Sequence, residues 1–85
     1  MTRLFRPPQP VVVTVTTTGE PATFLYERER WRVTTLFNRW RLQTHWWEER
    51  AVSRAYYQVG TDSGLVAVLY KDREEGEWFL ERVYD

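Results

Sequence analysis

The amino-acid sequence predicts an all-β fold: a six-stranded antiparallel meander, rolled into a small barrel or a strongly curved sheet, with at most one short helix near residues 44–53. Three observations predict this class. β-branched and aromatic residues dominate short segments, as they do in strands. Turn-forming residues separate these segments about every eight to twelve positions. The last two expected strands are apolar on both faces, so a flat sheet with one face in water would leave too much apolar surface wet.

The N-terminal part contains an arm and the first two strands. Three prolines stand within residues 1–10, which we expect to form an extended N-terminal arm ahead of a single small β domain over residues 11–85. The run VVVTVTT at residues 11–17 is β-branched throughout, which favours a strand over a helix. After the turn TGEP, alternating apolar residues in ATFLYE predict a second strand at residues 22–27.

A slip in the apolar pattern marks the third strand. Trp31 and Phe37 fall at odd-numbered positions that share a face, whereas Trp40 and Leu42 fall at even-numbered positions. One extra residue in a strand moves every following side chain to the other face. The sequence therefore predicts a bulge or short loop around residues 37–39, which would reconcile the two sets of apolar residues.

The C-terminal part predicts three further strands. Residues 44–54 lack strand alternation and are expected to form a loop or one or two helical turns. Apolar runs then predict strands at residues 55–59, 65–70 and 77–83, separated by the turns GTDSG and KDREEG. We expect a core of nine apolar side chains, drawn from all the strands: Val13, Phe24, Trp31, Val33, Tyr57, Val59, Leu69, Trp78 and Leu80.

Residue types that perform catalysis or hold a metal are scarce. The chain has no cysteine and a single histidine, His45, which rules out disulfides, thiolate sites and histidine-rich metal sites. No Gly-rich phosphate loop and no nucleophile elbow occurs in the sequence. We therefore expect a protein that is not an enzyme and has no cofactor and no metal. Because no apolar run approaches the roughly 20 residues of a membrane span and residues 1–10 lack a signal-peptide segment, we also expect a cytoplasmic protein without membrane contact.

The stretch RWRLQTHWWEER, which begins at Arg39, is the most informative for function. If its start is extended, Arg39 and Arg41 share a face and Trp40 lies opposite. Trp46 and Trp47 are neighbours and must point in different directions, so if one enters the core, the other lies on another surface. Outward positions on the adjacent strands add further arginines and a tyrosine. The candidate partner-binding residues, for protein or nucleic acid, are Arg32, Arg39, Arg41, Trp46, Trp47, Arg50, Arg54 and Tyr56.

Three interpretations of these residues are open. Trp46 and Trp47 can both be core residues covered by the aliphatic stems of the arginines. Trp, Tyr and Arg are also the residues that dominate protein–protein hot spots, and the same types stack on bases and contact phosphates. Between the two functional interpretations, the balanced charge of 12 basic and 12 acidic residues favours a protein partner over nucleic acid.

The pattern WRL…HWWEER…RAYYQV…DSG…LYKD…GEWFLERVYD resembles an uncharacterised family of small bacterial domains. These occur alone or as the C-terminal extension of Y-family-like DNA polymerase homologues of the ImuB type. ImuB-type proteins serve damage-induced translesion synthesis, and their C-terminal regions are associated with partner recruitment. The resemblance therefore implies a repair-associated interaction module. Together with the residue pattern, it leads us to expect a non-catalytic module, linked to DNA-damage tolerance, that docks a protein partner through the Trp/Arg surface. The alternative is a small β-barrel that binds single-stranded nucleic acid through the same surface. The most specific residues of the resemblance are Trp40, Arg41, Trp46, Trp47, Gly76, Trp78, Leu80, Tyr84 and Asp85.

Overall fold

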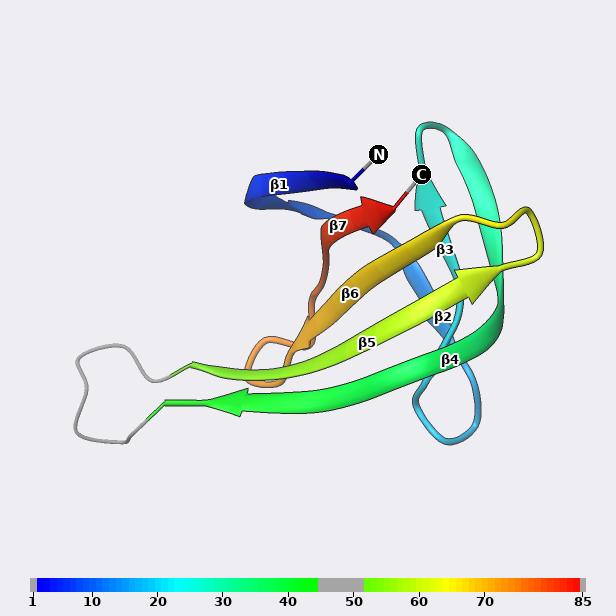
Figure 1. The fold of residues 1–85 in the computed structure, drawn as a ribbon. Coiled ribbons are helices and arrows are strands. Elements are labelled where there is room, and N and C mark those ends of the chain that lie inside the picture. The colour runs from blue at the N-terminus through cyan, green and yellow to red at the C-terminus, as the bar shows by residue number, and fades with distance from the viewer. Residues whose placement is uncertain (1, 45–51, 85) are drawn as a thin grey trace.

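The computed structural model describes residues 2–44 and 52–84, which form seven β-strands (Figure 1). The strands are β1 (Thr2–Pro10), β2 (Val13–Val15), β3 (Pro21–Tyr26), β4 (Glu29–Gln43), β5 (Ser53–Thr61), β6 (Val66–Asp72) and β7 (Trp78–Tyr84). The described residues form no helix, and so none that is long and apolar enough to span a membrane. The short helix allowed near residues 44–53 falls largely on residues 45–51, which lie outside the described residues.

All seven strands belong to one antiparallel sheet in the order β1-β7-β6-β5-β4-β3-β2. From β2 to β7 each strand pairs with its neighbour in sequence, so the predicted all-β meander is confirmed. The sheet has seven strands rather than six because the segment expected to be an extended arm is strand β1. It pairs with β7 at both of its ends, for example Thr2 with Tyr84 and Pro10 with Phe79.

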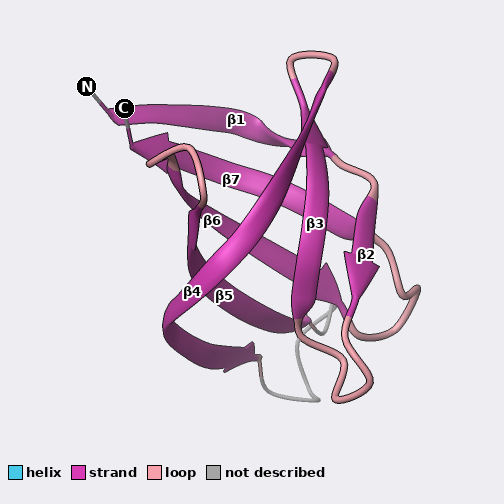
Figure 2. Cartoon of the chain, turned by 90° about the vertical axis from the view of Figure 1, so that its right-hand side faces the viewer, coloured by secondary structure: helices cyan, strands magenta, loops and turns pink. Residues whose placement is uncertain are grey.

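The sheet curls into a half-barrel whose two edge strands meet at one corner (Figure 2). β1 and β2 are the edges, yet only Val11 and Val12 separate them in the chain. The backbone N–H of Val11 donates to the Trp78 carbonyl at 3.1 Å, which extends the β1–β7 pairing. The Val12 carbonyl accepts from the N–H of Leu25 at 3.0 Å, which extends the pairing of β2 with β3. This corner confirms the predicted curvature.

Strand β4 contains two register shifts against β5. One lies between Leu36 and Asn38, where the sequence predicts a bulge, and a second lies between Val33 and Thr35. Each shift exchanges the two faces, so two of them cancel. Odd-numbered residues therefore face the interior at both ends of β4. The expectation that a single bulge reconciles Trp40 with the apolar face of the preceding residues is wrong, because Trp40 lies on the outer face.

The interior of the half-barrel is filled by one apolar cluster from β3 to β7. Phe24, Val59, Leu69 and Leu80 are fully buried at its centre. All nine side chains predicted for the core belong to it: Phe24, Val59, Leu69, Trp78 and Leu80 are buried, and Val13, Trp31, Val33 and Tyr57 are partly buried and packed against it. A second, smaller cluster covers the outer face of the sheet and leads to the candidate site.

Candidate docking surface

Four aromatic side chains form a row across the outer face of the sheet. The register places Trp40 opposite Tyr56, Tyr56 opposite Tyr70, and Tyr70 opposite Phe79, one residue from each of β4, β5, β6 and β7. Side chains directly opposite in a sheet approach within about 5 Å, close enough for rings to stack. The ring centroids are accordingly 5.2, 5.1 and 5.1 Å apart. We call these four residues the aromatic row.

The aromatic row is buried in its middle and exposed at its β4 end. Tyr56 and Tyr70 are 6% and 4% exposed, and the desolvation that follows raises the pKa of Tyr70 above its ordinary value. Trp40 lies parallel to the Tyr56 ring, at an interplanar angle of 3°, and is 41% exposed. The row therefore presents one rigidly stacked indole to solvent.

Arg54 covers the middle of the aromatic row. Its guanidinium carbon lies 4.6 Å from the centroid of the Tyr70 ring, within the range of a cation–π contact. Its Nη1 donates to the Tyr56 hydroxyl at 3.2 Å, and this hydrogen bond raises the pKa of Arg54. Arg54 thus covers the aromatic row with a charged group, and contacts within the domain hold its side chain in place.

Two further apolar side chains extend the exposed end of the aromatic row along β4. Leu42 follows Trp40 by two residues and shares its face, and it is 43% exposed. Phe37 lies over Gly60, since a Cβ at Gly60 would stand 2.8 Å from Phe37 Cε2. Gly60 alternates with Tyr56 on the outer face of β5, so Phe37 also lies outside, at 58% exposure. Phe37, Trp40 and Leu42 together form what we call the apolar patch.

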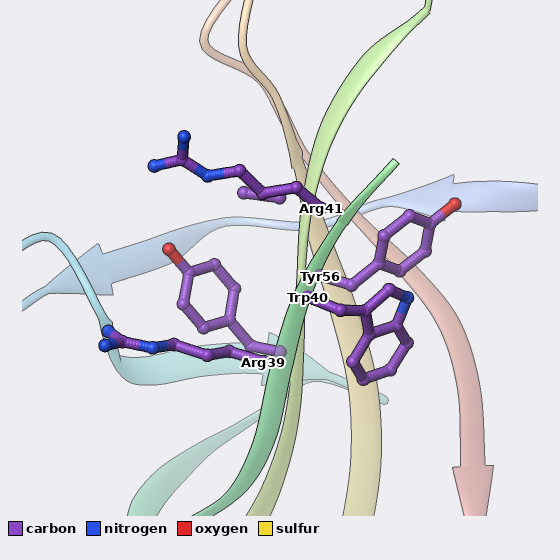
Figure 3. A pocket seen from close by; sticks show the side chains of 6 residues that line it. Arg39, Trp40, Arg41 and Tyr56 are labelled. Carbon is purple, nitrogen blue, oxygen red and sulfur yellow. The ribbon is translucent and has the colours of Figure 1, made fainter. Parts of the chain in front are cut away.

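The opposite side of the same strands carries two arginines. Figure 3 shows Arg39 and Arg41 on one side of β4, with Trp40 and Tyr56 on the other. A pocket of about 360 Å³ lies there. Arg39 pairs with Glu20 at 3.2 Å, whereas Arg41 makes no ion pair with any residue that the structure describes. The residues that line the pocket are Arg39, Trp40, Arg41, Ala55, Tyr56 and Tyr57.

The family description DUF6504, a domain of unknown function, matches residues 6–85. The chain belongs to the DUF6504 family. This membership confirms the resemblance to an uncharacterised domain family at that level. No curated protein and no solved structure is detectably similar to the chain. The DUF6504 description assigns no activity to the domain.

The DUF6504 domain does not gather the predicted site residues on one face. Arg54 and Tyr56 lie on the outer face, whereas Arg39 and Arg41 lie on the inner side, because alternation sets them opposite Trp40 and the register aligns Trp40 with Tyr56. The predicted common surface of these residues is therefore divided by the sheet. Tyr56 supports the surface from below rather than contacting solvent. Of the other predicted residues, Arg32 is exposed and pairs with Asp62 at 3.3 Å, and Trp46, Trp47 and Arg50 lie outside the described residues.

Sequence reasoning missed the apolar patch. The alternation in RWRL places Trp40 and Leu42 on one face and the two arginines on the other, so the shared face of Trp40 and Leu42 could have been predicted from the sequence. Phe37 had none, because its position over Gly60 depends on the bulge and on the register with β5.

Several acidic side chains in the described parts of the DUF6504 domain take part in turns or ion pairs. Asp72 accepts the backbone N–H of Glu74 at 3.0 Å and caps the β6–β7 turn. Within residues 2–44 and 52–84, no group of three or more His, Asp or Glu side chains is placed to hold a metal ion.

Proposed function

We propose that this DUF6504 domain is a non-catalytic module that docks a protein partner through the apolar patch. The observation that carries the proposal is the exposure of Phe37, Trp40 and Leu42 on the outer face of β4, with Trp40 stacked on the buried ring of Tyr56. Clustered exposed apolar side chains are typical of interaction sites. Trp is moreover the residue type most enriched among the hot spots of protein interfaces.

The support beneath Trp40 favours binding. An indole already stacked on Tyr56 loses little side-chain freedom when a partner covers it, so little entropy opposes its burial. A Trp side chain buries roughly 150–250 Å² when fully covered. The 41% of Trp40 that is exposed thus offers roughly 60–100 Å², or about 2 kcal/mol at 25 cal/mol per Å². That is the size of a hot-spot contribution.

The resemblance of the sequence to the C-terminal extensions of ImuB-type polymerase homologues supports a partner that acts in DNA-damage tolerance. We propose that the module works in the cytoplasm as a recruiter of such a protein, without a cofactor and without chemistry of its own.

Single-stranded nucleic acid is the second candidate partner, and the charges of the described residues favour protein over it. Arg39 and Arg32 are paired with carboxylates, and Arg54 is held over the aromatic row. Surface ion pairs open at little cost, but the carboxylates of Glu20 and Asp62 would still repel a phosphate chain. Arg41 alone would give a log–log salt slope of only about −0.7.

The test compares two identical substitutions on different strands. Leu42 on the apolar patch and Leu25 on β3 are 43% and 40% exposed, so Leu42→Ser and Leu25→Ser should disturb the fold equally. Immobilised wild-type and variant domains are incubated with lysate from DNA-damaged cells, and captured proteins are quantified by mass spectrometry. We expect a protein that Leu42→Ser loses and Leu25→Ser retains.

Two results would overturn the proposal. Equal capture by the Leu42→Ser and Leu25→Ser variants would show that the apolar patch does not bind the partner. Sub-micromolar, salt-sensitive binding of a labelled single-stranded oligonucleotide, measured by fluorescence anisotropy at two salt concentrations, would make nucleic acid the primary partner.

A further inference from the structure

Over residues 34–43, the β3 side of strand β4 has no strand partner among the residues that the structure describes. Its pairing with β3 ends at Arg32, opposite Thr23, whereas its pairing with β5 continues to Gln43, opposite Ser53. Every residue over 34–43 is exposed. In the part of the chain that the structure describes, the β3 side of this stretch therefore faces solvent. We call it the open edge.

The backbone groups that face the open edge follow from the ladder with β5. The N–H of Thr44 donates to the Val52 carbonyl at 2.9 Å, so Thr44 points toward β5. Because backbone groups alternate sides along an antiparallel strand, Arg39, Arg41 and Gln43 direct their N–H and C=O groups away from β5. The N–H of Arg39 fits this assignment, since it donates to the side-chain Oδ1 of Asn38, 2.9 Å away.

The open edge differs from the other two edges of the sheet. β1 contains three prolines, which lack the N–H that a further strand would need, and β2 is only three residues long. Residues 34–43 contain no proline and are long enough to pair with a peptide. Of the three edges, the open edge of β4 is thus the one suited to accept a strand.

The side chains along the open edge define what it accepts. A strand added beside β4 would meet Arg39 and Arg41 on the inner side and Trp40 and Leu42 on the outer side. Glu20 already places a carboxylate against Arg39 at 3.2 Å, whereas Arg41 has no acidic partner among the residues that the structure describes and can receive a carboxylate from an added strand. The complementary strand therefore alternates acidic residues with apolar ones.

We propose that the open edge binds an extended segment of the partner protein, with alternating acidic and apolar residues, as an additional strand of the sheet. This inference rests on the proposed function and specifies how the partner binds: the backbone supplies hydrogen bonds, the apolar patch receives the apolar residues, and Arg41 receives a carboxylate. A second copy of the domain is a poor occupant. Symmetric pairing of two β4 strands would bring Arg39 and Arg41 of both copies to the same face, where like charges repel.

The first test uses synthetic peptides with the full-length domain. A labelled decapeptide of alternating glutamate and valine is titrated by fluorescence anisotropy, with an alternating lysine–valine peptide and a block peptide of the same composition as controls. We expect the alternating acidic peptide to bind most tightly, Arg41→Glu to reverse the preference toward the lysine peptide, and hydrogen exchange at the Arg41 and Gln43 amides to slow on binding. Equal affinity for the three peptides would refute the proposal.

The second test removes one backbone donor and keeps every charge. The N–H of Gln43 faces the open edge, so Gln43→Pro should leave the β4–β5 ladder intact and retain the melting temperature. Loss of that hydrogen bond should weaken binding of the acidic peptide about fivefold or more. Unchanged affinity in a folded Gln43→Pro variant would rule out strand addition.

The two proposals fail separately in the capture assay. Loss of the partner in Leu42→Ser together with retention in Gln43→Pro would leave docking on the apolar patch standing and overturn strand addition. Retention in Leu42→Ser would overturn the docking function itself.

Discussion

Replacing Gly60 with alanine tests whether Phe37 is held by the surface beneath it. The new Cβ would lie 2.8 Å from Phe37 Cε2 and 3.2 Å from Cζ, closer than packed carbon atoms approach. The ring is 58% exposed, so it can swing outward and give up the 42% (100 − 58) that is covered. That covered part corresponds to roughly 60–105 Å², or about 2 kcal/mol. Alanine returns about 0.4–1 kcal/mol by restricting the unfolded chain, so a net loss of about 1–1.5 kcal/mol is expected.

The assay is thermal unfolding of Gly60→Ala in two backgrounds. In the wild-type background the melting temperature should fall by about 5–10 °C, given about 4–8 °C per kcal/mol for a domain of this size. In a Phe37→Ala background the obstructing ring is gone, so the same substitution should raise the melting temperature. An equal loss in both backgrounds would refute the reasoning, because the clash would then involve something other than Phe37.

Three further substitutions test the core, a buried tyrosine and a turn. Trp78→Ala should cost about 3–5 kcal/mol in urea unfolding, because the side chain is packed in the interior, and a loss below about 1 kcal/mol would contradict that placement. Burial raises the folded-state pKa of Tyr70 above 10.0, so the contribution of its neutral hydroxyl to stability is complete below pH 10 and declines above it. Tyr70→Phe should therefore shift alkaline unfolding to higher pH, and an unchanged unfolding midpoint would contradict this. Glu27 and Arg28 both have positive φ, 52° and 65°, so the double change to Asn-Gly should stabilise the domain by about 1 kcal/mol in a thermal melt, and destabilisation would exclude a strained turn.

Local alternation was sufficient to predict the core. Val59 and Tyr57 share a face by period-two spacing, and so do Leu80 and Trp78. Because side chains alternate between the two faces of a strand, the buried face can be identified from residues close together in the sequence. These assignments needed no knowledge of which strands pair.

The rest depended on non-local register. Trp40 lies on the outer face because of a second bulge near Thr34 that no residue type marks. The aromatic row requires four strands to align, which turns and bulges set jointly. Thr2 pairs with Tyr84, which is far away in the sequence. The three prolines within residues 1–10 also gave no sign that this segment forms a strand. Hence Arg39 and Arg41 could be set opposite Trp40 from sequence, while their separation from Arg54 could not.

The pairing of β1 with β7 also fixes the order in which the chain can fold. Hairpins from β2 to β7 join strands that are neighbours in sequence, so each can form soon after its second strand is synthesised. β1 has no place in the sheet until β7 emerges, although it is made first. Its closure carries the largest loop-entropy cost in the molecule and should be the slowest step of folding. Until that step, the edge of β7 stays unpaired, which makes the unfinished sheet prone to association with other chains.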